Sequence, residues 1–394
     1  MIVESPVTTG MESCGPAPGS RVLVAMSGGV DSSLTAQLLV QQGFDIIGVN
    51  MRTHRLSKEE LAMGAKIKTC CSPTDAKDAR ACAMRSEFPF YVIDVEQDFE
   101  RDVIDPFIRA YMSGRTPNPC VLCNNHVKLG LLLEKAALWN CDSVATGHYA
   151  RKVIHPETGR FTLKRAKDLG KDQCYYLYGL TQAQLEKIVF PLGDLTKAEV
   201  REQARGAALP TADKPESQEI CFIPDNDYRK FLRKRFEKSG TEMPRGKFLT
   251  VDGEEMGEHE GIAFYTVGQR KGLGLSGGTG EPLYVVSIDP VGHNIILGPR
   301  RHVLFDGLSA DGLNWMGLES LDGPIRARVQ IRHRHAPAWA MIEPAGADRV
   351  DVWFDEAQQA VSPGQATVFY DAGDRVLGGG WIIEGTHRPG AAEA

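Results

Sequence analysis

Two groups of residues in this chain have types and spacing that suit chemistry. The first is the loop Ser27-Gly-Gly-Val-Asp-Ser-Ser33, which follows a short apolar run. Its glycines let the backbone approach an anion closely, and the N-terminus of a following helix offers free N–H groups. The loop has neither the Gly-Lys-Ser/Thr ending of a Walker A motif nor a GxGxxG pattern. It therefore predicts a different kind of phosphate-binding loop, with a purely structural turn as the alternative.

The second group is made of cysteines. Cys120 and Cys123 follow the rigid stretch 116–119 and begin a predicted helix, where a thiol pKa is lowered and a nucleophilic thiolate is favoured. A CxxC pair fits half of a zinc site equally well. A third thiol, Cys221, lies in Lys214-Pro-Glu-Ser-Gln-Glu-Ile-Cys-Phe-Ile-Pro224. By itself it is more typical of a buried core cysteine.

The elements that must position these residues alternate between strand and helix. Apolar runs at 21–26 and 45–51 predict strands, and 34–42 between them has helical spacing, which gives a βαβ unit. The alternation continues with helices at 75–88 and 124–139, strands at 90–95 and 143–146, and two helices within 181–208. Thr181-x-x-Gln184 and Thr196-x-x-Glu199 predict capping boxes for these last two helices. The sequence therefore predicts an α/β domain with a parallel sheet.

The texture changes after about residue 215. One helix is predicted at 227–237, and short strands separated by turn residues follow at 248–251, 284–288, 295–297, 325–332, 350–354, 366–370 and 379–383. This spacing is typical of small β-barrels. We expect a disordered leader at 1–20, a nucleotide domain at 21–216, a small β-rich central domain at 217–290 and a C-terminal β-barrel at 291–390.

Composition limits the class of protein. The 394 residues carry a formal net charge of −6 and contain nine cysteines. No apolar run reaches the roughly 18 residues that span a membrane, and no basic, apolar signal peptide begins the chain. We expect a cytoplasmic protein without a membrane partner. In a chain of this length, nine cysteines are not typical of the disulfide framework of a small secreted protein. The acidic balance argues against a nonspecific coat for nucleic acid, but it leaves room for local basic patches.

The loop at 27–33 resembles the signature Ser-Gly-Gly-x-Asp-Ser of the PP-loop ATP pyrophosphatases. With the segments at 114–125 and 214–224, the ordered motifs resemble the tRNA-specific 2-thiouridylase (MnmA/TrmU) family. Further matching motifs lie at 145–151, 171–177, 266–272 and 362–365. The resemblance covers essentially the whole chain after the leader.

The resemblance implies a site for ATP and Mg²⁺ at the carboxyl ends of the parallel strands. The residues that it assigns to ATP are Ala25, Met26, Ser27, Gly28, Gly29, Val30, Asp31, Ser32, Met51 and Gly147. In that family ATP adenylates the C2 oxygen of the wobble uridine of tRNA, and sulfur from a cysteine persulfide then displaces AMP.

By position, the resemblance makes Cys221 the persulfide carrier and Cys123 the nucleophile that ends disulfide-bonded to it. It implies the tRNA anticodon stem-loop as substrate and a cysteine desulfurase or sulfur-relay protein as sulfur donor. The tRNA contacts that it assigns are Asn118, Pro119, Cys120, His148, Lys171, Asp172, Gln173, Arg332, His333 and Gln365. Chemistry on a stacked base requires that base to be flipped out.

Cys120 departs from the family pattern, which has Asp there as the presumed general acid/base. Cys120, Cys123 and Cys221 could instead hold a [4Fe–4S] cluster with one open iron. We favour the persulfide route because both family thiols are retained.

The segment 53–80, with Cys70 and Cys71, is interpreted as a solvent-facing insertion, with a metal site as the alternative. The basic run at 326–335 favours phosphate contacts, whereas the run at 229–238 is equally consistent with a solvated face and an RNA contact.

Three rival functions remain from sequence alone. Another PP-loop adenylating enzyme, such as an amidating or argininosuccinate synthetase, would need neither the cysteine pair nor tRNA. A tRNA-binding or iron–sulfur protein with a vestigial loop would not bind ATP. A 4-thiouridine sulfurtransferase would usually carry additional N-terminal RNA-binding domains.

Overall fold

The structure is a computed structural model that describes residues 15–53, 73–215, 220–223, 225–275 and 280–388. Most of the expected leader and the pair Cys70 and Cys71 lie outside these residues. The chain forms two compact units. The first comprises residues up to 102, 120–226 and 373–376, and the second comprises 103–119, 227–372 and 377 onward. Within the described residues, no helix is both long and apolar enough to cross a membrane.

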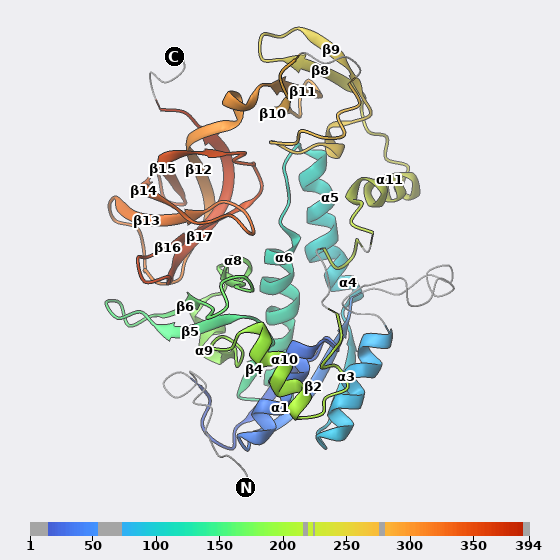
Figure 1. The fold of residues 1–394 in the computed structure, drawn as a ribbon, viewed down its shortest axis with the longest axis vertical. Helices are drawn as coiled ribbons and strands as arrows, with labels where there is room; N and C mark the ends of the chain where they lie inside the picture. Colours follow the sequence, from blue (N-terminus) through green and yellow to red (C-terminus); the bar gives the residue numbers. More distant parts are fainter. Residues whose placement is uncertain (1–14, 54–72, 216–219, 224, 276–279, 389–394) are drawn as a thin grey trace. The chain divides into compact units, whose positions relative to one another are not determined.

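The first unit is built on a five-stranded parallel sheet, which confirms the predicted α/β layer (Figure 1). The strand order is β3-β2-β1-β4-β7, and Val22, Leu23 and Val24 of the central strand are fully buried. The strands are β1 (Arg21–Ala25), β2 (Asp45–Arg52), β3 (Phe90–Asp94), β4 (Ser143–Ala145) and β7 (Ile188–Val189). Because all five are parallel, their carboxyl ends meet along one edge.

Helices cover this sheet. Leu34 and Leu38 of α1 pack against Val200 and Ala204 of α10 in one buried cluster. Both predicted capping boxes are present, at Thr181 and Thr196. The helices are α1 (Val30–Gln41), α3 (Pro73–Arg85), α4 (Glu96–Phe99), α8 (Cys174–Leu177), α9 (Gln182–Lys187) and α10 (Lys197–Gly206).

The predicted helix at 124–139 begins earlier and is not a regular α-helix. It consists of α6 (Pro119–Leu122), the π-helical η3 (Cys123–Leu131) and α7 (Leu132–Leu138). A second π-helical turn, η2 (Glu100–Ile104), follows α4. π-Helical turns are rare and frequently occur at functional sites. Their i→i+5 bonding leaves no distinctive apolar spacing, so the sequence could not reveal them.

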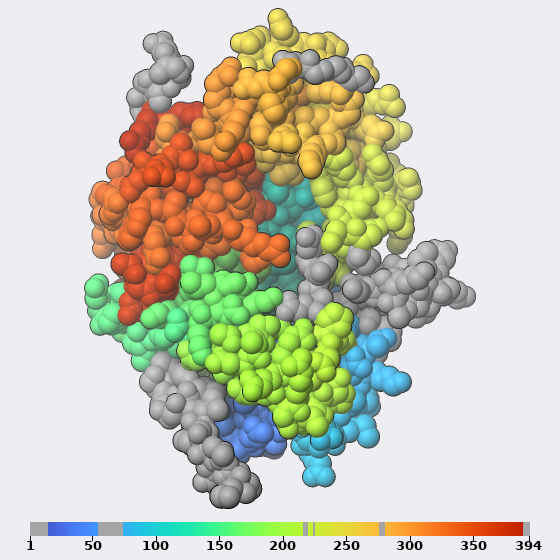
Figure 2. Space-filling view, viewed as in Figure 1, coloured from blue at the N-terminus to red at the C-terminus, as the bar shows by residue number. Residues whose placement is uncertain are grey.

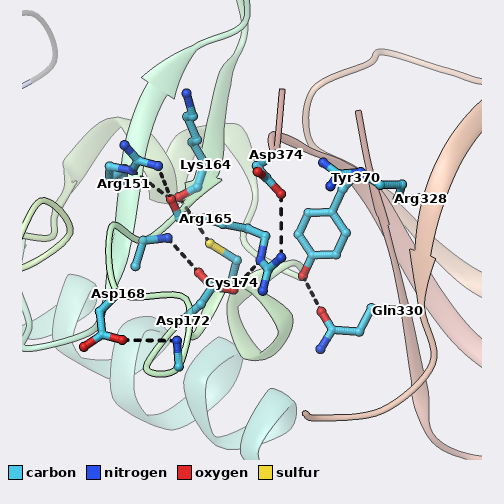
Figure 3. A network of polar contacts seen from close by, with 12 residues as sticks. Arg151, Lys164, Arg165, Asp168, Asp172, Cys174, Arg328, Gln330, Tyr370 and Asp374 are labelled. Carbon is cyan, nitrogen blue, oxygen red and sulfur yellow. Dashed lines mark hydrogen bonds and ion pairs between the residues drawn. The ribbon is translucent and has the colours of Figure 1, made fainter. Parts of the chain in front are cut away.

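A hairpin of β5 (Ala150–Ile154) and β6 (Phe161–Arg165) completes the first unit. Thr162 donates a hydrogen bond to the carbonyl of Val376 at 2.5 Å, and Arg165 lies 3.6 Å from Asp374. These contacts attach residues 373–376 to the hairpin, and Figure 3 shows the pair of Arg165 and Asp374. The sequence reading missed both strands of the hairpin.

The second unit contains the predicted helix at 227–237, observed as α11 (Tyr228–Ser239) with Asp227 as its N-cap. α5 (Asp105–Met112) and η4 (Ile262–Phe264) accompany it. A four-stranded sheet of order β10-β11-β8-β9 surrounds a small core that includes Phe248 and Val285. Its strands are β8 (Gly246–Thr250), β9 (Glu255–His259), β10 (Tyr284–Asp289) and β11 (Asn294–Gly298).

The C-terminal strands close into the expected β-barrel, in the order β12-β15-β14-β13-β16-β17. Ile342, Val352 and Phe369 are fully buried in its core. After η5 (Arg300–Val303), the strands are β12 (Leu304–Trp315), β13 (Ile325–Gln330), β14 (Ala338–Pro344), β15 (Arg349–Gln359), β16 (Ala366–Tyr370) and β17 (Val376–Thr386). Neither β12 nor β14 was predicted, because glycines and alanines dilute their alternation.

Candidate active site

A cavity of about 330 Å³ opens at the carboxyl ends of β1, β2 and β4 in the first unit. It gathers nine of the ten residues assigned to ATP by resemblance, all except Gly28. It also gathers three of the residues assigned to tRNA: His148, Lys171 and Gln173. The other lining residues are Val49, Asn50, Asp75, Lys128, Thr146, Tyr149, Lys197, Lys214 and Pro215.

The loop at 27–33 is held in a compact turn by its own side chains. The Ser32 hydroxyl accepts a hydrogen bond from the Ser27 amide at 3.2 Å and donates one to the Gly29 carbonyl at 3.2 Å. Gly28 has φ +75°, and a Cβ there would overlap the carbonyl of Asp75. A Cβ at Gly147 would lie 2.8 Å from the Ser32 amide nitrogen. The two glycines thus bring neighbouring segments into backbone contact around the helix N-terminus.

Asp31 at the first turn of α1 is engaged by two other segments. Lys197 Nζ lies 2.7 Å from each carboxylate oxygen, and the Tyr149 hydroxyl donates a hydrogen bond to Oδ1 at 2.7 Å. Tyr149 is fixed in turn by Gln173, whose side-chain oxygen accepts from the Tyr149 amide at 3.0 Å. This network links the loop to α10 and to the 171–177 motif.

Lys214 forms a second polar link. Its Nζ donates to the Gly28 carbonyl at 2.9 Å, to Asp75 at 2.7 Å and to Asp78 at 2.5 Å. Burial lowers the pKa of Lys214, but the hydrogen bonds that its Nζ donates to the two carboxylates outweigh burial and raise this pKa above its ordinary value. The first turn of α3 is therefore tied to the loop, so 73–80 is not the solvent-facing insertion that we expected.

His148 is a buried, neutral side chain. Its Nδ1 is hydrogen-bonded to the Thr146 hydroxyl at 2.8 Å, and its ring packs edge-on against Phe190. Burial and the nearby charge of Lys128 lower the pKa of His148 to about 3. A neutral imidazole can position a base or sugar by hydrogen bonding, but it offers no positive charge to a phosphate.

The thiols lie in the first unit, and none of them lines the cavity. Cys120, Cys123 and Cys221 form no disulfide in this structure. Burial raises the pKa of Cys120, which is contrary to the expected effect of the helix start. Phe222, beside Cys221, packs edge-on against Phe99 at 5.7 Å and anchors the segment within the unit.

The three cysteines do not form a ligand set. In the part of the chain that the structure describes, no three His, Cys, Asp or Glu side chains are close enough to hold a metal ion. The arrangement therefore does not fit an iron–sulfur cluster on Cys120, Cys123 and Cys221. Mg²⁺ is different, because it is commonly held by one or two carboxylates together with substrate phosphates. Asp31 and Asp75 in the cavity fit that requirement.

The other residues assigned to tRNA lie elsewhere. Asp172 is buried, accepts from the Ala166 amide at 2.9 Å and pairs with Arg165 at 3.3 Å (Figure 3). In the second unit, Gln365 donates to the Thr116 and Pro117 carbonyls at 3.2 and 3.0 Å. Asn118 and Pro119, also in that unit, are buried, whereas His333 is exposed and Arg332 half-buried.

Sequence reasoning identified Lys171 but missed the other three lysines of the cavity. Lys128, Lys197 and Lys214 come from three segments far apart in the chain, and spacing alone could not bring them together. A local signal did exist for Lys197, because it is the first residue after the predicted Thr196 cap. Lys214 begins the motif that carries Cys221. Asn50, which donates to the Met26 carbonyl at 2.7 Å, had no signal of this kind.

Comparison with known proteins gives consistent matches along the chain. Three family models match: a tRNA methyl transferase HUP domain at 20–225, a tRNA methyl transferase PRC-barrel domain at 229–299 and an aminomethyltransferase beta-barrel domain at 305–382. Among solved structures, a 4-thiouridine synthetase–RNA complex with bound ATP matches 56% of this chain and 51% of its own. Its identity to this chain is 14%, and its TM-score is 0.32.

The curated relatives are far more similar. The tRNA-specific 2-thiouridylase of Koribacter versatilis is 48% identical over 366 residues, covering 92% of this chain and 98% of the relative. That of Carboxydothermus hydrogenoformans is 48% identical over 362 residues, with 92% and 97% covered. Because this identity extends over nearly the full length of this chain and of each relative, the chain belongs to the tRNA-specific 2-thiouridylase family.

Proposed function

We propose that this protein uses ATP to thiolate C2 of the wobble uridine of tRNA, with Cys221 and Cys123 as the working thiols. Family membership makes the enzyme a sulfurtransferase that acts on tRNA with ATP. The cavity is the main support for the use of ATP at this site. The loop at 27–33, an α-helix N-terminus and several lysines surround a space there that suits a triphosphate. Mg²⁺ held by Asp31 and Asp75 would supply charge neutralisation to the phosphates.

In the proposed first step, the C2 oxygen of uridine attacks the α-phosphorus of ATP and pyrophosphate leaves. Oxygen bound to C2 is a poor leaving group until it carries AMP. Lys197 and Lys214 lie where they can hold anionic oxygens of the nucleotide, and α1 presents its free N–H groups to the same space. His148, being neutral, positions the base or sugar by hydrogen bonding.

In the proposed second step, the terminal sulfur of a Cys221 persulfide forms a bond to C2 and AMP departs with the C2 oxygen. The Cys123 thiolate then attacks Sγ of Cys221, which breaks the S–S bond, releases 2-thiouridine and closes a Cys123–Cys221 disulfide. A dithiol reductant restores the starting thiols. Cys120 stands at the family's Asp position, and burial raises the pKa of its thiol, so we expect this thiol to stay protonated.

The test is formation of thiouridine by iron-free protein supplied with ATP, unmodified tRNA, cysteine and a cysteine desulfurase. Nucleoside mass spectrometry with chromatography separates 2-thiouridine from 4-thiouridine. We expect 2-thiouridine from the wild type and loss of product, by at least about a hundredfold, from Cys221→Ser and Cys123→Ser. Cys141→Ser, which changes a thiol outside the proposed site, is the matched control and should retain activity.

A cluster-reconstituted anaerobic sample run in parallel decides between the two sulfur routes. Product from this sample alone would overturn the persulfide assignment. Formation of 4-thiouridine would overturn the position of attack, and ATP turnover without tRNA would favour an amidating or argininosuccinate-type synthetase instead.

A further inference from the structure

The second unit carries a strongly basic helix outside the cavity. α11 contains Arg229, Lys230, Arg233, Lys234, Arg235 and Lys238 but only one acid, Glu237. This excess of positive charge occurs in a chain whose formal net charge is −6. A basic run is usually a solvated face, so its geometry must decide what it does.

The arginines and lysines of α11 have different environments. Arg229 lies over the ring of Tyr265 at 5.2 Å, and Arg235 lies over Phe231 at 5.3 Å. Arg233 lies over Phe264 at 5.0 Å and pairs with Glu260. The arginines are thus committed to aromatic rings of the same unit. By contrast, the three lysines are exposed to solvent.

The lysines form a line. Lys230, Lys234 and Lys238 are spaced four residues apart, which places them on one face of the helix over a length of about 12 Å. Leu232 and Phe236 on the opposite side are buried, and Tyr228 stacks on Tyr111 at 4.8 Å. The helix is therefore fixed by its apolar side, and α11 belongs to the segment drawn in yellow-green in Figure 2.

This arrangement differs from an ordinary solvated helix. Opposite charges at i and i+4 stabilise a helix, whereas like charges at this spacing repel each other. The lysine line contains two successive like-charge pairs of this kind, Lys230–Lys234 and Lys234–Lys238, and each of these pairs by itself disfavours the helix. Such a cost is expected where the charges serve a ligand.

We infer that the lysine line of α11, formed by Lys230, Lys234 and Lys238, binds the phosphate backbone of the tRNA substrate. A linear row of point charges suits a polyanion. A protein partner would require an apolar centre in the interface, and none of the exposed large apolar side chains of the described residues lies on α11. The inference rests on tRNA being the substrate and adds a backbone contact that is independent of the reacting base.

The test is equilibrium binding of unmodified tRNA to the full-length enzyme at several salt concentrations. The triple variant Lys230→Gln, Lys234→Gln, Lys238→Gln should raise the Kd at low salt by at least about tenfold. It should also make the slope of log K against log salt less steep by about two to three. The kcat at saturating tRNA and the affinity for ATP should be unchanged.

The matched control removes the same charge elsewhere, with Lys77→Gln, Arg85→Gln and Lys187→Gln, all exposed residues of the first unit. An unchanged Kd and slope in the α11 variant would overturn the inference, as would an equal loss in the control. Normal tRNA binding with lost sulfur delivery would overturn it in favour of a protein docking site. If the wild type itself bound no tRNA, the proposed function would fail first, and this surface with it.

Discussion

Asp31 meets two partners that come from distant parts of the chain, Lys197 and Tyr149. Hydrogen bonds to charged groups contribute about 1.5–3 kcal/mol each. We therefore expect Lys197→Met to weaken ATP binding by roughly tenfold or more, because a cation is lost beside the triphosphate and Asp31 is left partly uncompensated. Lys197→Arg should retain most of the affinity. Isothermal titration with ATP measures both, and equal affinity of the Met variant and the wild type would contradict the assignment.

His148 should link the stability of the protein to pH. Its pKa is about 3 in the folded state, below the ordinary value of about 6.5. Between these values the unfolded chain binds more protons, so stability is full above pH 6.5 and decreases as the pH falls toward 3. For one histidine the slope is at most about 1.4 kcal/mol per pH unit.

His148→Gln should remove the part of the acid destabilisation that comes from His148. Denaturant unfolding at pH 6.5, 5.5 and 5.0 should then show a smaller decrease in the free energy of unfolding than in the wild type. His126→Gln changes an exposed histidine and serves as the control. Identical slopes for wild type and His148→Gln would show that His148 is not held neutral by burial.

Among the elements, the loop at 27–33 contains adjacent glycines with different roles. Gly28 has φ +75°, and a Cβ would collide with the Asp75 carbonyl, whereas at Gly29 the nearest atom would be the Ser27 hydroxyl at 3.6 Å. We expect Gly28→Ala to destabilise the protein by about 1–3 kcal/mol through strain and overlap. Gly29→Ala should be neutral or slightly stabilising. Urea unfolding of the two variants tests this, and similar losses would contradict the structure.

The same loop illustrates what local sequence can predict. Strand, loop and helix follow one another within about twenty residues, so apolar spacing and glycine position identified them, as Thr-x-x-Gln and Thr-x-x-Glu identified two capping boxes. The π-helical Cys123–Leu131 could not be predicted, since its bonding shifts without changing residue type. The raised pKa of Cys120 was also missed, because burial depends on tertiary packing rather than on position in a helix.

At the scale of the whole molecule, the cavity is assembled from residues that are distant in sequence. Met51, Lys128, Gly147, Lys197 and Lys214 meet there only because parallel strands end at one edge and α10 packs on α1. The loop motif and the family resemblance identified the nucleotide loop, but only the fold brings the lysines to it. The lysine line on α11 was visible in sequence as a charge run, whereas its exposure and the aromatic contacts of its arginines required the structure.

The two compact units each have their own buried cluster, and this predicts which core changes affect ATP. Leu34 and Ile342 are both almost fully buried, one beside the nucleotide loop and the other in the barrel. Truncating either to Ala should cost about 2–5 kcal/mol of stability.

Effects at distant, independent sites are usually additive. We therefore expect Leu34→Ala to weaken ATP binding as well, because α1 is displaced, and Ile342→Ala to leave the ATP Kd within about twofold. Thermal unfolding with and without ATP measures the stability of the two variants, and titration with ATP measures their affinity. A similar loss of ATP affinity in the two variants would mean that the barrel core supports the nucleotide site.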